Sequence, residues 1–158
     1  MKLVIAGVSG SGKTTIGTLV AQLAGTEFLD ADAFHPEANI RKMSQGVPLT
    51  DEDRTGWLET LGEELKKRSS VVLACSALKR SYRDRLRAYA PDLRFVLLTL
   101  DKSDLEKRLE TRADTGHFMP ATLLDSQLAT LETGDDLFLI ENSDTPETVA
   151  QTIWQKVS

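Results

Sequence analysis

Short apolar runs recur along the chain, and longer amphipathic segments separate them. Each run is about six residues long, the length of a buried strand, and most show no alternation of apolar and polar positions. Continuous apolar runs of this kind are typical of a parallel sheet that is covered on both faces. The predicted strands are KLVIAG (2–7), EFLDA (27–31), VVLACS (71–76), RFVLLTL (94–100) and LFLIE (137–141).

The segments between the runs have the period of amphipathic helices. Within residues 13–24, apolar side chains recur at spacings of three and four, which places them on one face of a helix. Thr50 and Asp53 have the spacing of a reciprocal cap, and Pro146 stands where a first helical residue is expected. The predicted helices are 13–24, 50–68, 103–112 and 145–157.

The alternation of strands and helices predicts the fold class. Strand–helix–strand units in one sheet make right-handed crossovers and leave their strands parallel. We find no internal repeat, low-complexity tract or linker along the chain. Residues 1–158 are therefore predicted to form a single α/β domain, with a five-stranded parallel sheet and helices on both of its faces.

The composition narrows the class of protein. The chain has 158 residues, 41% of them hydrophobic and 27% charged, as is ordinary for a soluble globular domain. The net charge of −5 argues against general affinity for nucleic acid, which depends on Lys and Arg at phosphates. No apolar stretch approaches the roughly 20 residues of a membrane span, and no signal peptide is evident. The one cysteine, Cys75, is expected to be a core residue of a cytoplasmic protein rather than a catalytic thiol.

A phosphate-binding loop is predicted near the start of the chain, where GVSGSGKT (7–14) matches G-x-x-x-x-G-K-[ST] between a strand and a helix. There, glycines let backbone N–H groups converge on one anion, and the helix N-terminus adds its positive field. Lys13 would reach the β- and γ-phosphates, and the Thr14 hydroxyl would hold Mg²⁺. The predicted nucleotide-binding residues are Gly7, Val8, Ser9, Gly10, Ser11, Gly12, Lys13, Thr14 and Thr15. The alternative is a glycine-rich turn without a ligand, but the full motif in this context favours a nucleoside triphosphate.

A GTP-dependent switch is the competing class for a protein with this loop. DRTG (53–56) has the form DxxG, and DKSD (101–104) follows a predicted strand as a guanine-reading NKxD motif would. The first stretch, however, lies within a predicted helix. The second has Asp101 where the motif needs an asparagine amide, and a carboxylate repels the acceptor atoms of guanine. The sequence therefore favours a small-molecule kinase that uses ATP.

Two carboxylates and a histidine follow the second predicted strand, in FLDADAFHP (28–36). Ligands of an open parallel sheet bind at the carboxyl ends of its strands, so Asp30 and Asp32 are expected beside the phosphate loop. A kinase that acts on an alcohol needs a carboxylate there to orient the hydroxyl and take its proton. We assign that role to Asp32, whereas Asp30 would order Mg²⁺ through water or support the fold, and His35 would bind substrate hydroxyls or pack. The alternative for the two carboxylates is capping, with Pro36 as a first helical residue.

Four stretches together resemble the gluconokinase family. They are GVSGSGKTT (7–15), LDADAFHPEANIRKMSQGVPLTDEDRTGWL (29–58), ACSALKRSYRDRLR (74–87) and GHFMPATLLDSQLATLE (116–132). The resemblance covers nearly the whole chain and implies a three-layer P-loop kinase fold with a helical lid around 103–132. It implies that ATP, with Mg²⁺, phosphorylates D-gluconate on its 6-hydroxyl to give ADP and 6-phospho-D-gluconate, which leads gluconate into the pentose phosphate pathway. It also implies a cytoplasmic homodimer that binds neither nucleic acid nor membrane.

The chain departs from the family pattern at a few loop positions. Ala31 and Phe34 stand where glycine and leucine are expected, and Gly56 replaces a proline before Trp57. None of these changes removes a charged group that the predicted site needs. The family also resembles shikimate and nucleoside-monophosphate kinases, so another small hydroxy acid is the alternative acceptor.

The resemblance to gluconokinases directs attention to cations, because gluconate is an open-chain polyol with a carboxylate and no flat ring. Arg54 is one candidate ligand. Lys79 and Arg83 are two more, four residues apart and hence on one face of a predicted helix after the third strand. Further candidates are Arg80, Arg41 and Lys42. The alternative is a solvated basic helix, because the basic run continues beyond Arg83.

A lid is expected in LEKRLETRADTGHFMP (105–120), because related kinases close such a segment to exclude water during phosphoryl transfer. Arg108 and Arg112 are four residues apart in it. One of them could stabilise charge on the transferred phosphoryl group or stack on adenine, and we assign Arg112 to catalysis and Arg108 to nucleotide binding. An exposed helix face is the alternative for both. The resemblance also implies that the turn ENSDTP (141–146) borders the adenine.

Overall fold

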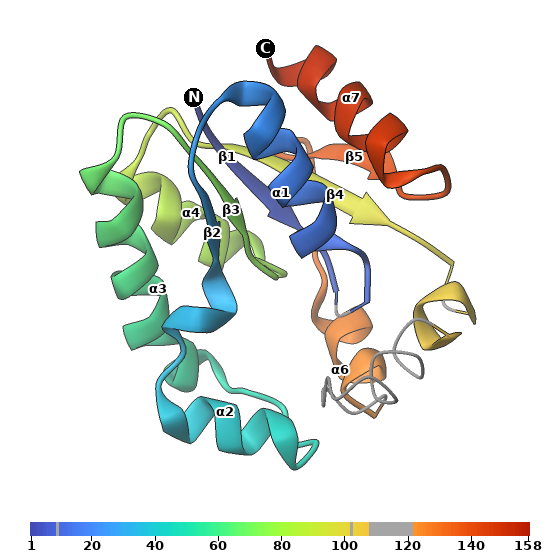
Figure 1. The fold of residues 1–158 in the computed structure, drawn as a ribbon. Helices are drawn as coiled ribbons and strands as arrows, with labels where there is room; N and C mark the ends of the chain where they lie inside the picture. The colour runs from blue at the N-terminus through green and yellow to red at the C-terminus, as the bar shows by residue number, and fades with distance from the viewer. Residues whose placement is uncertain (9, 102, 108–121) are drawn as a thin grey trace.

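A five-stranded parallel sheet forms the centre of the computed structural model, which describes residues 1–8, 10–101, 103–107 and 122–158 (Figure 1). The strands are β1 (Lys2–Ala6), β2 (Phe28–Asp30), β3 (Val71–Ala74), β4 (Arg94–Thr99) and β5 (Phe138–Glu141). They lie in the order β2-β3-β1-β4-β5, and every neighbouring pair is parallel. The predicted α/β fold and its five-stranded parallel sheet are confirmed.

Helices connect the strands and begin largely where the sequence predicts. They are α1 (Lys13–Ala24), the 3₁₀ helix η1 (Ala31–Phe34), α2 (Glu37–Ser44), α3 (Asp51–Lys67), α4 (Arg80–Tyr89), α6 (Thr122–Thr130) and α7 (Pro146–Val157). Thr50 and Asp53 form the predicted reciprocal cap of α3, and Pro146 opens α7. The predicted helices above did not include α2, although one alternative made Pro36 a first helical residue. Pro36 is instead the N-cap of α2.

Two helical layers cover the two faces of the sheet. Helices α1 and α7 pack together on one face, and α3 and α4 pack together on the other (Figure 1). Side chains alternate along β1, so Leu3 and Ile5 enter the core under α1, whereas Val4 and Ala6 enter the core under α3. Because both faces are buried, the strand is apolar at successive positions, which explains the unbroken runs in the sequence.

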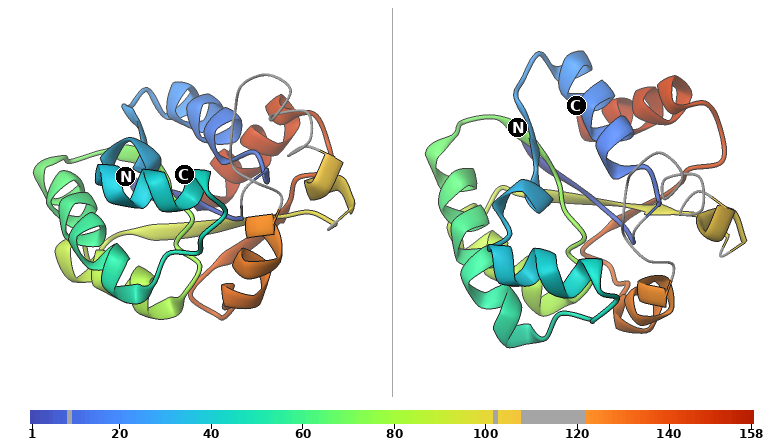
Figure 2. Two further views of the ribbon diagram at one scale, coloured as in Figure 1. Left: turned by 90° about the horizontal axis from the view of Figure 1, so that it is seen from below. Right: turned by 60° about the horizontal axis from the view of Figure 1, so that its bottom comes forward.

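The strand order determines where ligands can bind. From the central strand β1, the sheet continues on one side to β3 and β2 and on the other to β4 and β5. The chain thus builds the sheet outward in two directions from β1. Where the direction changes, the carboxyl ends of neighbouring strands leave a crevice between them. Helices α2 and α6 lie at this end of the sheet, away from the two chain termini (Figure 1 and Figure 2).

The predicted lid region, 103–132, is described only at its two ends. Residues 103–107 are helical, and α6 forms the other end. Arg108 and Arg112 lie outside the described residues, as does Ser9 of the phosphate loop. No helix in the described part of the chain is long and apolar enough to span a membrane.

Candidate active site

The phosphate loop joins the end of β1 to the start of α1, as its motif predicts. Gly12 is the N-cap residue of α1, and its φ of 96° lies in the left-handed region that favours glycine. A Cβ atom on Gly7 would lie 2.4 Å from Ser11 Oγ, so the loop closes tightly only with glycine there. The N-cap Gly12 offers no side chain to cap α1, and a helix N-terminus without a side-chain cap presents backbone N–H groups to an anion. This local geometry suits a phosphate group.

Two side chains of the loop take positions that suit nucleotide chemistry. The Lys13 ammonium donates to the Val8 carbonyl at 3.1 Å and lines a pocket at the carboxyl ends of the strands. The Thr14 hydroxyl donates to Asp30 Oδ2 at 3.3 Å. Hydroxyl and carboxylate oxygens are the ligands that Mg²⁺ prefers, and Mg²⁺ in kinases is held by few protein groups together with substrate phosphates. The donor set at Thr14 therefore fits this ion.

A buried asparagine after β5, the edge strand beyond β4, supports the loop. Asn142 donates through Nδ2 to the Ser11 carbonyl at 2.7 Å, and its backbone N–H donates to the Thr99 carbonyl. The turn 141–146, which the family resemblance places at adenine, thus touches the phosphate loop. Sequence patterns did not assign this supporting role to Asn142, because the contact joins residues 131 positions apart.

The two aspartates after β2 have different surroundings. The Asp30 carboxylate accepts from the Asp32 backbone N–H at 3.0 Å, so it caps η1, and it also accepts from Thr14. The alternative of a capping role therefore holds for Asp30. The Asp32 side chain is 64% exposed, lines the pocket with Lys13, and accepts no hydrogen bond within the described part of the chain. Its carboxylate is thus available to a ligand.

His35 is packed against a neighbouring ring, and it also lines the pocket. Its ring stacks on Trp57 with centroids 4.1 Å apart, and its side chain is only 3% exposed. Burial, with a further effect from Arg54, lowers the pKa of His35 to about 4, against a smaller opposing effect of Asp30. The imidazole is therefore neutral at pH 7.

Arg54 of α3 lines the pocket and is held by the segment before α3 and by α4. One guanidinium nitrogen donates to the Leu49 carbonyl at 2.7 Å and to the Tyr82 hydroxyl at 3.1 Å, and the guanidinium lies over the Tyr82 ring. The Tyr82 hydroxyl donates to Asp51, which also accepts from the Lys79 ammonium at 2.9 Å. Hydrogen bonds from Tyr82 and then Lys79 lower the pKa of Asp51. Lys79 therefore supports Arg54 through Asp51 and Tyr82 and does not itself line the pocket.

The prediction that Arg83 binds substrate is corrected by its surroundings. The Arg83 side chain is 1% exposed, and it forms an ion pair with Asp136 at 2.8 Å. Its remaining N–H groups donate to backbone carbonyls of residues 77, 78 and 132. All donors of this guanidinium are thus used inside the fold. Because the guanidinium is buried, it bonds to partners inside the protein and not to solvent. Through Asp136 and the Glu132 carbonyl, Arg83 holds the segment after α6 against α4.

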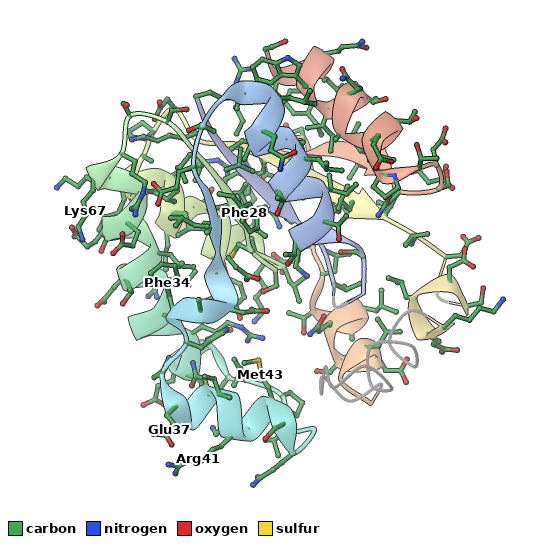
Figure 3. The ribbon with its side chains drawn as sticks, in the orientation of Figure 1. Phe28, Phe34, Glu37, Arg41, Met43 and Lys67 are labelled. Atoms are coloured by element: carbon green, nitrogen blue, oxygen red, sulfur yellow. The ribbon has the colours of Figure 1, made fainter. Side chains whose placement is uncertain are left out.

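The further cationic candidates also have partners away from the pocket. Arg41 pairs with Glu37 at 2.9 Å, and both lie on the outer side of α2 in Figure 3, opposite Met43. Lys42 pairs with Asp53 at 2.8 Å. Arg80 contacts Asp135 at 3.4 Å. Only Arg54, among these cations, lines the pocket.

Several pocket residues carried no assignment from the sequence. Ser76 follows β3, and the rule that ligands bind at strand ends would have found it. The polar residues from α6 are Ser126, Gln127 and Thr130, and the apolar residues are Met43, Val47, Pro48, Leu49 and Leu78. The pocket thus has a polar wall from α6 and an apolar wall that comes mainly from α2 and the segment after it. Nothing in the sequence of α6 places it opposite α2.

The structure also decides two alternatives left by the sequence. DRTG (53–56) lies inside α3, with Asp53 in its reciprocal cap, so it is not the loop of a GTP-dependent switch. Cys75 is buried, and burial raises the pKa of its thiol to about 12, as expected for a core residue.

Comparisons with known proteins agree with this geometry. A family model described as "AAA domain" matches residues 3–133. The chain is 52% identical to a gluconokinase of Gluconobacter oxydans (strain 621H), over 85% of this chain and 77% of that protein. It is 42% identical to a gluconokinase of Arabidopsis thaliana, over 99% of this chain and 92% of that protein.

A solved structure shares the fold at similar identity. The crystal structure of a gluconokinase from Sinorhizobium meliloti 1021 superposes with a TM-score of 0.87 and 44% sequence identity, covering 99% of this chain and 92% of that chain. The strand order, the phosphate loop and identities of this size over most of each chain lead to one conclusion: the chain belongs to the gluconokinase family of P-loop kinases.

Proposed function

We propose that this protein transfers the γ-phosphoryl group of ATP to the 6-hydroxyl of D-gluconate, giving 6-phospho-D-gluconate and ADP. One observation carries the proposal beyond family membership. The Asp32 carboxylate, Lys13 of the phosphate loop and the Arg54 guanidinium line one pocket. A base, a phosphate ligand and a carboxylate ligand are the groups that this reaction needs.

The nucleotide end of the reaction would rest on the phosphate loop. Backbone N–H groups of residues 7–15 would surround the phosphates, and Lys13 would turn from the Val8 carbonyl to the β- and γ-phosphates. Thr14 would hold Mg²⁺, with Asp30 orienting the Thr14 hydroxyl, and the ion would supply positive charge at the phosphates. Arg112 and Arg108 are proposed to stabilise the transferred group and to contact the nucleotide.

The acceptor end would rest on Asp32, His35 and Arg54. Asp32 would accept the hydrogen bond of the 6-hydroxyl and take its proton as the new O–P bond forms. Arg54 would bind the gluconate carboxylate with donors that Leu49 and Tyr82 do not use, because a guanidinium has five N–H groups in a planar fork. Lys79 would act through Asp51 and Tyr82 by keeping Arg54 in place. A cytoplasmic homodimer is proposed from the family resemblance.

An acceptor panel tests the proposed substrate. A coupled ADP-release assay with gluconate, shikimate, other sugar acids and nucleoside monophosphates should give the highest kcat/KM with gluconate, by about 100-fold or more. The reason is that buried polar groups left without partners reject a wrong acceptor strongly. A higher kcat/KM with another hydroxy acid would contradict the proposed acceptor.

Replacing Arg54 by Lys tests the carboxylate site. The variant keeps the charge but loses the planar fork, so the KM for gluconate should rise by about 10- to 100-fold while the KM for ATP stays nearly unchanged. Arg41→Lys is the matched control, because Arg41 lies on the outer side of α2 and should leave both constants unchanged. Equal increases in both KM values for Arg54→Lys would indicate a fold defect instead.

A further inference from the structure

A buried asparagine contacts His35 from the next helix. Asn39 lies in α2 and is 3% exposed. Its amide nitrogen Nδ2 lies 2.9 Å from the Asp53 backbone carbonyl and 3.2 Å from His35 Nδ1. One amide group thus bridges the first turn of α3 and the imidazole in the pocket.

The carbonyl partner determines how this amide must be oriented. A backbone carbonyl only accepts hydrogen bonds, so the Asn39 atom beside Asp53 must be the NH₂ group and not the amide oxygen. The same NH₂ group has a second hydrogen, which points to His35. His35 Nδ1 must therefore accept this hydrogen bond with its lone pair. In a neutral imidazole the proton is then on the other ring nitrogen, Nε2.

The surroundings of His35 favour this neutral form. Arg54 from α3 repels a protonated imidazole, and the stacked Trp57 ring excludes water from one of its faces. The acidic groups that face it are Asp30 at the end of β2 and Asp32 in η1. Their attraction is outweighed, since burial lowers the pKa of His35 to about 4. Protonation of Nδ1 would also set two N–H groups against each other at Asn39.

We propose that Asn39 is a positioning residue that holds His35 as the Nε2–H tautomer, so that His35 presents a hydrogen-bond donor beside the Asp32 carboxylate. This inference rests on the proposed function, because it concerns how the acceptor hydroxyl is bound. His35 Nε2 and Asp32 Oδ1 lie 4.0 Å apart, which is too far for a direct hydrogen bond. A hydroxyl oxygen about 2.8 Å from each atom would close that triangle.

The tautomer matters because a hydroxyl has one proton. Bound between the two groups, it donates this proton to Asp32 and accepts from Nε2–H, so every partner is satisfied. With the opposite tautomer, Nε2 and Asp32 would both be acceptors, and one of them would remain without a hydrogen bond. Asn39 would thereby make the pocket complementary to a hydroxyl group without touching the substrate.

Proton–nitrogen correlation spectra of the imidazoles test the tautomer directly. The chain has two histidines, so a His35→Gln variant identifies the His35 signals by their loss. In the wild-type protein without substrate, Nε2 should be pyrrole-like and Nδ1 pyridine-like from about pH 6 to about pH 9. A protonated Nδ1 in this range would overturn the proposal, whatever the acceptor proves to be.

Asn39→Asp tests the consequence for catalysis, because it replaces the donor by a near-isosteric acceptor. The carboxylate should draw a proton to His35 Nδ1 and raise the pKa of the ring. In this variant Nε2 carries a proton only while the ring is a cation, because the neutral ring keeps its proton on Nδ1. As the pH rises and the ring loses its second proton, kcat/KM for gluconate relative to wild type should fall about 10- to 100-fold. The KM for ATP should not follow this profile.

Ile153→Val is the control for a general loss of stability. Ile153 lies in α7 and is buried in the core on the opposite face of the sheet, so its truncation lowers stability without reaching the pocket. It should leave the tautomer and the pH profile unchanged. The positioning role would be overturned if the pH profile of kcat/KM for Asn39→Asp ran parallel to that of Ile153→Val. It would also be overturned if the variant kept full activity with Nδ1 protonated and Nε2 unprotonated. Wild-type spectra with Nε2–H but no turnover of gluconate would instead contradict the proposed function and leave the tautomer standing.

Discussion

Replacing Asp32 by Asn is expected to lower kcat for gluconate phosphorylation by about 10²–10⁴ while ATP still binds. The substitution keeps the shape of the side chain and removes the charge that would take the hydroxyl proton. The fold should tolerate it, because the Asp32 carboxylate is exposed and accepts no hydrogen bond within the described part of the chain. The ADP-release assay measures kcat, and titration with a non-hydrolysable ATP analogue measures binding.

Glu37→Gln is the matched control for this charge removal. Glu37 is an exposed carboxylate on the outer side of α2, paired with Arg41, and does not line the pocket. Its variant should keep wild-type kcat and ATP affinity. Near-normal turnover of Asp32→Asn would remove Asp32 from the role of proton acceptor. Loss of ATP binding by the same variant would show that Asp32 supports the nucleotide site instead.

Replacing Asp136 by Asn should lower the free energy of unfolding by about 3–5 kcal/mol. Asp136 accepts from Arg83 at 2.8 Å and from Arg87 at 2.8 Å, and its side chain is 8% exposed. Without the carboxylate, the 1% exposed Arg83 guanidinium keeps a buried charge with no counter-charge. Urea unfolding followed by circular dichroism measures the loss. Asp135→Asn, at the neighbouring residue with a 92% exposed side chain, should change stability by less than about 1 kcal/mol.

The stability difference between wild type and Asp136→Asn should depend on pH. Burial raises the pKa of Asp136, but hydrogen bonds from Arg83 and Arg87 outweigh burial and lower that pKa to about 2. Because the folded-state pKa lies below the ordinary value of 3.8, this contribution is complete above about pH 4 and is lost as the pH falls through about 2. A difference that stays constant down to pH 2 would show that the charge of Asp136 is not what stabilises the fold.

This buried cluster also connects stability to the pocket. Arg83 donates to the Glu132 carbonyl, and the Glu132 backbone N–H donates to the Leu78 carbonyl at 2.7 Å. The chain segment that leaves α6 is thus fastened to α4 and to the residues after β3. Because Ser126, Gln127 and Thr130 of α6 line the pocket, Arg83 contributes to the shape of the pocket by holding this wall in place.

Local patterns in the sequence were enough to predict the nucleotide end of the site. The GVSGSGKT motif requires only consecutive residues between a strand and a helix, and the structure has them there. Asp30 and Asp32 were expected beside this loop because parallel strands end at one edge of a sheet. Both expectations depend on backbone direction, which hydrophobic periodicity reveals.

The side chains at the proposed acceptor end of the pocket could not be predicted from local patterns. Arg54 and Arg83 look alike in sequence, yet one lines the pocket and the other is buried against Asp136, 53 residues away. Lys79 pairs with Asp51 and does not line the pocket. The role of Asn39 follows only from its contacts with His35 and the Asp53 carbonyl.

The sequence by itself therefore determined the fold class, the phosphate loop and the strand end that carries Asp32. The tertiary structure alone decided which cations line the pocket, which helix forms its polar wall and which partner His35 Nδ1 contacts. The physical reason is that burial patterns are encoded by periodic apolar residues, whereas a polar side chain acts according to the partners that distant segments bring within about 3 Å of it.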